Sequence, residues 1–206
     1  MSTEKVGQTR LSLLRAAERL FSERGVDNVS LREIAEVAKQ RNHAAAAYHF
    51  GDKRELIEQL LARHSGIVDD GFVPALDALR AEGRESLRTI VACLVQPMVA
   101  ILDDDDGGVD YLLICAQLVN SQTFPITSLR AANGPGAMEL TMRMLAFMPE
   151  MDPVVLPLRM TRTAAVLFYS IASYHRLTSA GVFVPRDKFV DDLIDSLVAL
   201  SAPHGL

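Results

Sequence analysis

Residues 29–50 of the chain read VSLREIAEVAKQRNHAAAAYHF, and this stretch predicts two short helices joined by a polar turn. Ser30 and Glu33 have the spacing of a capping box, in which the two side chains bind backbone N–H groups at the start of a helix. The apolar stripe of this first helix follows at helical spacing, at Leu31, Ile34, Ala35 and Ala38. Lys39 to Asn42 interrupts the stripe, and a second helix is expected over residues 43–49.

The second helix carries little side-chain bulk along its middle, at Ala44 to Ala47, but has polar groups at both ends. Arg41 and Asn42 precede the alanines, and Tyr48 and His49 follow them. Such a surface suits a helix that lies close against a partner, and the major groove of DNA is wide enough to admit an α-helix. The alternative is an ordinary packed hairpin, because alanine has the highest helix propensity. The polar ends favour the first interpretation.

The composition of the whole chain limits the class of protein. Its 206 residues, 49% of them hydrophobic, fit one large or two small domains with a sizeable core. Helical spacing of apolar residues continues to about residue 200 without strand-like alternation, which predicts an all-α fold. The sequence has no apolar run long enough to predict a transmembrane helix, and its polar beginning lacks a signal-peptide core. We therefore expect a cytoplasmic protein.

Charge is distributed unevenly along the chain, whose net charge is −5. Residues 1–64 contain eleven Lys and Arg against nine Asp and Glu, a net charge of +2. Residues 65–206 contain ten against seventeen, a net charge of −7. This asymmetry is weak evidence by itself, but it suits a small DNA-binding head on a larger body.

Two groups of residues carry atoms that could bind a metal ion. Cys93 and Cys115 lie far apart in apolar surroundings, which predicts buried thiols and leaves a zinc site without its other ligands. The run DDDDGG at residues 103–108 lacks the alternating ligands and distal Glu of an EF-hand, so we interpret it as a solvated turn. We expect neither a metal nor a cofactor.

Residues 9–64 resemble the DNA-binding head of the TetR family of transcriptional regulators. The matching features are FSERGVDNVSLREIAEVA at residues 21–38, the helix that ends in Tyr48, His49 and Phe50, and the Gly-Asp-Lys-x-x-Leu sequence that begins at Gly51. The resemblance implies a helix-turn-helix domain over residues 1–52 and a helical effector-binding and dimerisation domain over residues 53–206.

The turn between the two helices departs from the usual family pattern. The family usually has Ala-Gly where this chain has Ala38-Lys39, and the turn KQRN resembles a variant that is one residue longer. A left-handed conformation at Lys39 would cost about 1 kcal/mol or more, unless the turn has another shape. The register of the residues that face the bases therefore stays open by one position.

The resemblance implies that the second helix enters the major groove, and side-chain chemistry then assigns roles. Arg41 can donate two hydrogen bonds to guanine or clamp a phosphate, and Asn42 can read adenine or cap the helix. His43 lies at the front of the helix, where base contacts concentrate, and the methyl group of Ala45 or Ala46 can pack on a thymine methyl. These assignments make the turn and the first helical turn the base-reading part of the head.

Other residues of the head are expected to hold the DNA backbone. Ser30, with the N–H groups at the start of its helix, can bind a phosphate, and Arg32 in the same helical turn is a further candidate. Tyr48 and His49 are predicted phosphate contacts, although His49 has an alternative role in bonding within the head. Lys53 is assigned a phosphate contact by the resemblance.

The remainder of the chain carries no motif, so its roles rest mainly on the resemblance. Flexible methionines beside a few polar groups suit an apolar small-molecule pocket; its predicted lining is Met98, Tyr111, Cys115, Gln117, Met138, Met142, Phe168 and Tyr169. The helices predicted over 158–179 and 187–200 are apolar around more than one stripe, which suits a homodimer contact. The predicted contact residues are Leu167, Ile171, Tyr174, Phe189, Leu193, Ile194 and Leu197.

The function that these expectations favour is a ligand-responsive homodimeric repressor on a pseudo-palindromic operator, with double-stranded DNA and a small apolar effector as partners. Two alternatives are a helical protein-interaction module without a DNA role and a small helical enzyme. An enzyme is disfavoured because the sequence shows no convergent nucleophile and base; His175 stands beside Tyr174, but a single His on an apolar helix is usually a core residue. A non-enzymatic regulator is therefore expected.

Overall fold

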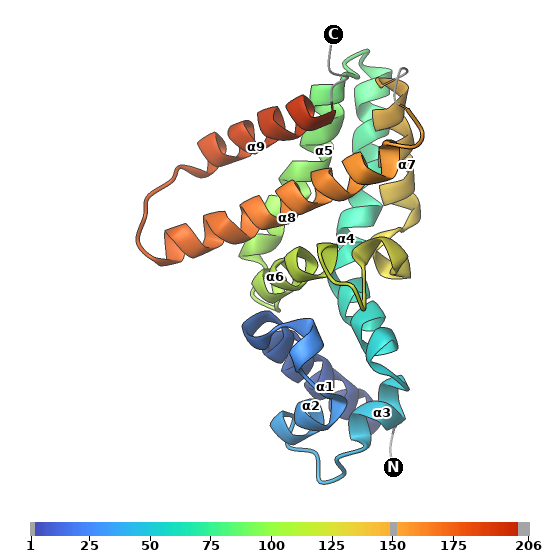
Figure 1. Ribbon diagram of the computed structural model, residues 1–206, viewed down its shortest axis with the longest axis vertical. Helices are drawn as coiled ribbons and strands as arrows, with labels where there is room; N and C mark the ends of the chain where they lie inside the picture. The colour runs from blue at the N-terminus through green and yellow to red at the C-terminus, as the bar shows by residue number, and fades with distance from the viewer. Residues whose placement is uncertain (1–2, 149–151, 202–206) are drawn as a thin grey trace.

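A computed structural model describes residues 3–148 and 152–201, which form nine α-helices and four short 3-10 helices without any strand (Figure 1). The expected all-α fold is therefore confirmed. The α-helices are α1 (Thr3–Arg24), α2 (Leu31–Val37), α3 (Ala45–Phe50), α4 (Lys53–Ala81), α5 (Leu87–Ala100), α6 (Gly108–Val119), α7 (Pro135–Ala146), α8 (Leu156–Ser179) and α9 (Arg186–Ser201). The 3-10 helices are η1 (Val26–Asn28), η2 (Ile101–Asp103), η3 (Ile126–Ser128) and η4 (Arg130–Ala132).

Helices α1 to α3 form a small head at one end of the molecule, packed on the first turns of α4 (Figure 1). Its core is built from the apolar faces that the sequence predicts, with Leu13 and Phe21 of α1 completely buried beside Ile34 of α2 and Ala46 of α3. Gly25 ends α1 with a φ of 92°, a conformation that glycine adopts without steric cost. The chain can therefore turn sharply into η1 and α2.

Helix α4 joins the head to the rest of the molecule. It begins at the cap residue Asp52, whose carboxylate accepts a hydrogen bond of 2.8 Å from the backbone N–H of Glu55. The helix continues through Pro74 for 29 residues in all. Packing against α5 and α7 keeps this segment helical despite the hydrogen bond that a proline removes.

The body consists of the remainder of α4 with α5 to α9. Helix α6 lies between head and body, since it packs on α8 on one side and on α1 on the other. Helices α8 and α9 run side by side across the body and are joined by a loop at its edge (Figure 1). Within residues 3–148 and 152–201, no helix is long and apolar enough to cross a membrane.

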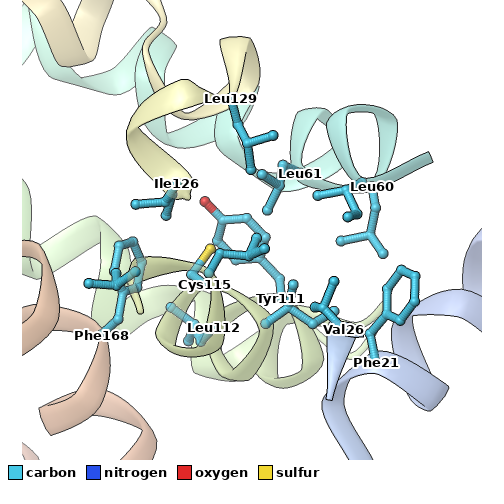
Figure 2. Close-up of a cluster of buried hydrophobic side chains, with 14 of the residues drawn as sticks. Phe21, Val26, Leu60, Leu61, Tyr111, Leu112, Cys115, Ile126, Leu129 and Phe168 are labelled. Atoms are coloured by element: carbon cyan, nitrogen blue, oxygen red, sulfur yellow. The ribbon is translucent and has the colours of Figure 1, made fainter. Parts of the chain in front are cut away.

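The hydrophobic core is continuous from head to body. Figure 2 shows Phe21 and Val26 of the head beside Leu60 of α4 and Leu112 of α6, with the cluster extending to Phe168 of α8. The head is therefore packed directly against the body and is not joined to it by a flexible linker alone. The division at residues 52 and 53 stays a prediction, because this core crosses it.

Candidate nucleic-acid interface and internal cavity

The capping box of α2 forms as its sequence predicts. The Ser30 hydroxyl accepts a hydrogen bond of 3.2 Å from the backbone N–H of Glu33, and the Glu33 carboxylate accepts one of 2.8 Å from the backbone N–H of Ser30. Hydrogen bonds from the Ser30 backbone and hydroxyl lower the pKa of Glu33. A charged Glu33 is therefore favoured at the end of the helix where the backbone dipole stabilises negative charge.

The turn between α2 and α3 contains a residue in the left-handed conformation. Lys39 has a φ of 56°, the only positive φ of a non-glycine residue in the described chain. Asn42 adopts the capping alternative, because its side-chain oxygen accepts a 2.9 Å hydrogen bond from the backbone N–H of Ala44. Helix α3 begins at Ala45, two residues later than expected, because residues 43 and 44 form a turn instead.

This later start decides which alanines face outward. Ala45 and Ala46 are buried against the head core, whereas Ala44 and Ala47 are exposed. The prediction that Ala45 or Ala46 contacts a thymine methyl is therefore wrong, since both methyl groups pack inside the head. Ala44 and Ala47 are the small side chains that leave room for a close partner.

Helix α3 and the turn before it lie at the outer end of the head (Figure 1), and polar residues adjoin the exposed alanines in the sequence. Tyr48 is 83% exposed, and Arg41, Asn42 and His43 are exposed in the turn. His49 is half-buried, with its ring 5.2 Å from that of Tyr48 and 6.4 Å from that of Phe50. Tyr48 is a large, mainly apolar side chain that the head leaves almost uncovered, so it is accessible to a partner.

Three predicted DNA contacts are already engaged within the head. Arg32 and His43 both approach the carboxylate of Glu36, at N–O distances of 3.2 and 3.4 Å. Lys53 is half-buried, and its ammonium lies 5.7 Å from the ring centres of both Phe21 and Phe124. Burial lowers the pKa of Lys53, against the opposing effect of Asp27 and Glu33. Lys53 thus contributes to packing at the start of α4.

The body encloses a cavity of about 310 Å³ between α4, α5, α6, α7 and α8. Its wall is mainly apolar and includes five of the eight predicted residues, Met98, Tyr111, Cys115, Met138 and Phe168. Three further methionines line it, Met144, Met148 and Met160, and the polar groups in the wall include Thr127, Asn133 and Thr141. The volume lies at the small end of the range for ligand pockets.

The other three predicted lining residues lie elsewhere. The Gln117 side chain makes two hydrogen bonds to the head. It donates one of 3.0 Å to the carbonyl of Phe21 and accepts one of 3.0 Å from the backbone N–H of Val26. Met142 and Tyr169 are 59% and 63% exposed and point away from the cavity. The helical stripes of α6, α7 and α8 each have two faces, and the sequence does not say which one borders a cavity.

Most of the residues predicted to contact a second protomer lie inside the protomer instead. Five of its seven residues are buried inside the protomer, namely Leu167, Ile171, Leu193, Ile194 and Leu197. The remaining two, Tyr174 and Phe189, stack on each other with ring centres 4.2 Å apart. The five buried residues therefore join α8 and α9 to the body, and the prediction that they contact a second protomer is wrong. Tyr174 and Phe189 are half-buried, and for them the contact stays a prediction.

A different set of apolar residues faces outward from α8 and the loop that follows it. Leu158, Tyr169 and Leu177 are 63%, 63% and 45% exposed. Val182 and Phe183 in the loop are 47% and 89% exposed. The spacing of Leu158, Tyr169 and Leu177 along one side of α8 is the signal by which this second stripe could have been found in the sequence.

The cysteines and the acidic turn were the candidate metal ligands in the sequence. Cys93 and Cys115 are free thiols, and burial raises the pKa of Cys115 to about 12. No group of three His, Cys, Asp or Glu within residues 3–148 and 152–201 is arranged to hold a metal ion. The acidic turn is not purely solvated, however, because Asp104 and Asp106 contact residues of α1 and α4.

Comparison with known proteins decides the family. Residues 13–60 match the family model for bacterial regulatory proteins of the tetR family, and residues 92–202 match that of the tetracyclin repressor-like C-terminal domain. The chain belongs to the TetR family. The second match alone covers more than half of its length.

Individual relatives match only a short part of this TetR-family chain. The HTH-type transcriptional regulator TtgR of Pseudomonas putida is 41% identical over 58 residues, which are 28% of this chain and 27% of that protein. ArpR of Pseudomonas putida, described as an HTH-type transcriptional regulator, gives the same values. The chain therefore aligns with about a quarter of the length of these relatives.

Two crystal structures match the chain at low similarity. One is a TetR-family transcriptional regulator from Rhodococcus sp., at 15% identity and a TM-score of 0.47, covering 95% of this chain and 100% of that one. The other is a gamma-butyrolactone receptor (ArpA-like protein), at 18% identity and a TM-score of 0.48, covering 97% and 98%. Both scores are too low to add to the family assignment.

Proposed function

We propose that this TetR-family protein is a homodimeric, ligand-responsive repressor that binds a pseudo-palindromic operator. The observation that carries the proposal is the outer surface of the head, where α3 presents exposed small and polar side chains with Tyr48 83% exposed. A helix-turn-helix places its second helix in the major groove, and such a surface allows the backbone of α3 to come close to the bases. Acting on DNA, the protein is expected in the cytoplasm.

On DNA, the exposed residues of the turn and of α3 are assigned the contacts. Arg41 would donate to guanine or to a phosphate, while Tyr48 would contact the backbone. His43 and Arg32 would exchange their bonds with Glu36 for contacts with DNA. The side of the interface that faces the phosphates would also include Ser30, Asn42, His49 and Lys53. Each of these four residues also makes a contact within the protein.

A second protomer would pack on the outward stripe of α8. One head reads only a few base pairs, and helix-turn-helix dimers place two heads about 34 Å apart, one turn of DNA. Exposed apolar side chains at Leu158, Tyr169, Leu177 and Phe183 supply surface that a two-fold contact would bury. This stripe replaces the buried residues that the sequence suggested.

The cavity is the proposed effector site. Its wall of methionine, leucine and phenylalanine side chains would take a small, mainly apolar molecule, and flexible methionines would adapt to its shape. Asn133, Thr127 and Thr141 offer hydrogen bonds that would orient one or two polar groups of that molecule. Binding there would release the operator.

A gel-shift assay on the DNA that flanks the gene of this protein tests the DNA role. Binding should weaken steeply between about 50 and 200 mM salt, because phosphate contacts release counterions. Arg41→Ala and Tyr48→Ala should each weaken binding by about 5- to 150-fold, the range for one lost contact. Arg84→Ala in the body, which also removes an exposed arginine, serves as the control and should bind normally.

The outcome of this assay separates the proposal from its rivals. Normal binding by both head variants would refute the placement of the recognition surface on α3. If no salt-dependent complex forms on that DNA, an interaction module without a DNA role becomes the better account. A catalytic role has no support in the described residues, and the family to which the chain belongs consists of regulatory proteins.

A further inference from the structure

The junction between head and body contains an ion-pair cluster that the proposed function does not explain. Asp106, in the turn before α6, accepts hydrogen bonds of 2.9 Å from Arg15 of α1 and 2.9 Å from Arg63 of α4. Arg63 also pairs with Glu18 of α1, which is only 2% exposed. The cluster therefore ties α1 of the head to both α4 and the acidic turn of the body.

His64 lies at the centre of this junction and is 4% exposed. Its Nδ1 is 3.1 Å from a carboxylate oxygen of Asp104, whereas its Nε2 is 3.5 Å from Glu18 and has no hydrogen-bond partner. Both ring nitrogens therefore face carboxylates, but only Nδ1 makes a hydrogen bond. A buried polar atom without a hydrogen bond costs free energy, so the contact between His64 and Glu18 contributes little to holding the junction together.

The turn is shaped to bring these groups together. Gly107 has a φ of 99°, and a Cβ placed there would lie 3.1 Å from the Glu18 carboxylate and 3.7 Å from His64 Nε2. At Gly108 an added Cβ would collide with the carbonyl oxygen of Ile101 at 2.1 Å. Gly107 therefore allows the close approach of the turn to the head, and Gly108 allows the turn to fold closely on η2.

Tyr111 connects His64 to the cavity. Its ring centre is 5.0 Å from that of His64, and the same side chain lines the cavity together with Cys115. Figure 2 shows Tyr111 and Cys115 together on α6, with Ile126 and Phe168 around them. A molecule in the cavity that displaces the Tyr111 ring therefore moves this ring toward His64 or away from it.

We propose that His64 is the positioning residue through which an occupied cavity changes the position of the head. Displacement of Tyr111 shifts the imidazole, which faces Glu18 without a hydrogen bond, and the head then turns about the weakened junction. Two ligand sites coupled in this way typically change each other's affinity by about 5- to 150-fold. The inference rests on the proposed function, since it needs both the operator and the cavity as binding sites.

The test uses 8-anilino-1-naphthalenesulfonate, an apolar fluorescent probe, as the cavity ligand, and the operator fragment found by gel shift. Operator affinity is measured by fluorescence anisotropy with and without saturating probe, and probe affinity is measured separately. Ala164→Trp, which fills the cavity from α8, identifies the probe bound there. The wild type should lose operator affinity by about 5-fold or more when the probe binds.

The affinity of His64→Gln for the probe should stay within about twofold of the wild type. Its operator affinity, however, should change by less than about twofold when the probe binds. A merely structural role of His64 would not produce this loss of coupling. His175→Gln, the same change on α8, should respond like the wild type. Asp106→Asn should also reduce the response, whereas Asp105→Asn should not, because Asp105 is exposed without an ion pair among the described residues.

The outcomes distinguish the inference from the function on which it rests. The inference is overturned if both His64→Gln and Asp106→Asn lose as much operator affinity as the wild type when the probe binds. It is also overturned if the wild type binds the probe in the cavity but keeps its operator affinity. In both cases operator binding itself stands. Failure of the wild type to bind the fragment overturns the proposed function instead.

Discussion

At the scale of single residues, Lys39 carries a conformational cost that the turn requires. Its φ of 56° places a side chain in the left-handed region, which costs about 1 kcal/mol or more for a residue other than glycine. Lys39 is exposed and its backbone N–H bonds the carbonyl of Glu36, so the position is fixed by the backbone and not by side-chain packing.

Lys39→Gly is therefore expected to raise the free energy of unfolding by about 0.5 kcal/mol, the steric relief less the extra entropy of the unfolded chain. Urea denaturation of the wild type and the variant measures the difference. Gln40→Gly, one residue later at a negative φ, is the control and should lower stability. Equal losses in both variants would show that the left-handed turn is not strained.

Cys115 gives the protein a predicted dependence on pH. Burial raises the pKa of its thiol to about 12, above the ordinary value of 9.0, so the folded state holds the proton more tightly than the unfolded state. The stabilisation is present below about pH 9 and is lost as pH rises toward 12, at up to about 1.4 kcal/mol per pH unit.

Denaturation curves at about pH 7, 9 and 10 measure this slope. Cys115→Ala should flatten the part of the slope above pH 9, whereas Cys93→Ala, which removes a half-buried thiol, should change it less. An unchanged slope in Cys115→Ala would mean that the thiol does not resist ionisation in the folded protein.

At the scale of elements, close packing of the α7 N-terminus on α4 is specified by small residues. Asp69 of α4 accepts hydrogen bonds of 3.0 and 2.6 Å from the backbone N–H groups of Gly136 and Ala137. A Cβ added at Gly136 would lie 2.1 Å from the backbone oxygen of Asp69. The approach of the two helices, which forms one wall of the cavity, therefore depends on that glycine.

Gly136→Ala should lower the free energy of unfolding by about 1–3 kcal/mol, as expected for overpacking. Gly71→Ala on α4 is the matched control, because nothing lies within 4 Å of its added Cβ and a helical Gly-to-Ala change should stabilise by about 0.5–1 kcal/mol. Thermal denaturation of both variants checks the opposite signs. A loss of stability in both would contradict the packing argument.

The helices themselves were largely predictable, because caps and apolar spacing are local signals. The capping box at Ser30 and Glu33 and the cap at Asp52 fixed the starts of α2 and α4. The continuity of α4 through Pro74 was not predictable, since it depends on α5 and α7 packed against it. The start of α3 was missed because residues 43 and 44 close a turn that the bond from Ala44 to Asn42 supports.

The candidate sites were less predictable than the helices, because an apolar stripe does not reveal what covers it. Leu167 and Ile171 of α8 face α6 and the core, whereas Tyr169 between them faces outward. Exposure at α3 likewise depends on register, which buried Ala45 and left Ala47 outside. The ion pairs of the acidic turn join residues about 40 to 90 positions apart, beyond any local pattern.

At the scale of the whole molecule, the outward stripe of α8 is expected to hold two protomers together. Tyr169→Arg should shift sedimentation velocity profiles from dimer toward monomer, because it places a charge in a surface that the dimer buries. Met142→Arg on α7 is the control, since Met142 is similarly exposed, at 59% against 63% for Tyr169. A dimer that survives Tyr169→Arg but not Met142→Arg would move the contact to α7.

The central claim is that two heads, each with an exposed α3, bind a two-fold symmetric DNA sequence. Selection of bound fragments from a random DNA pool by the wild-type protein tests it most directly. We predict enrichment of an inverted repeat whose half-sites lie about 34 Å apart, or a multiple of that, centre to centre. Enrichment of no sequence, or of the same motif by a Tyr48→Ala and Arg41→Ala double variant, would contradict the account.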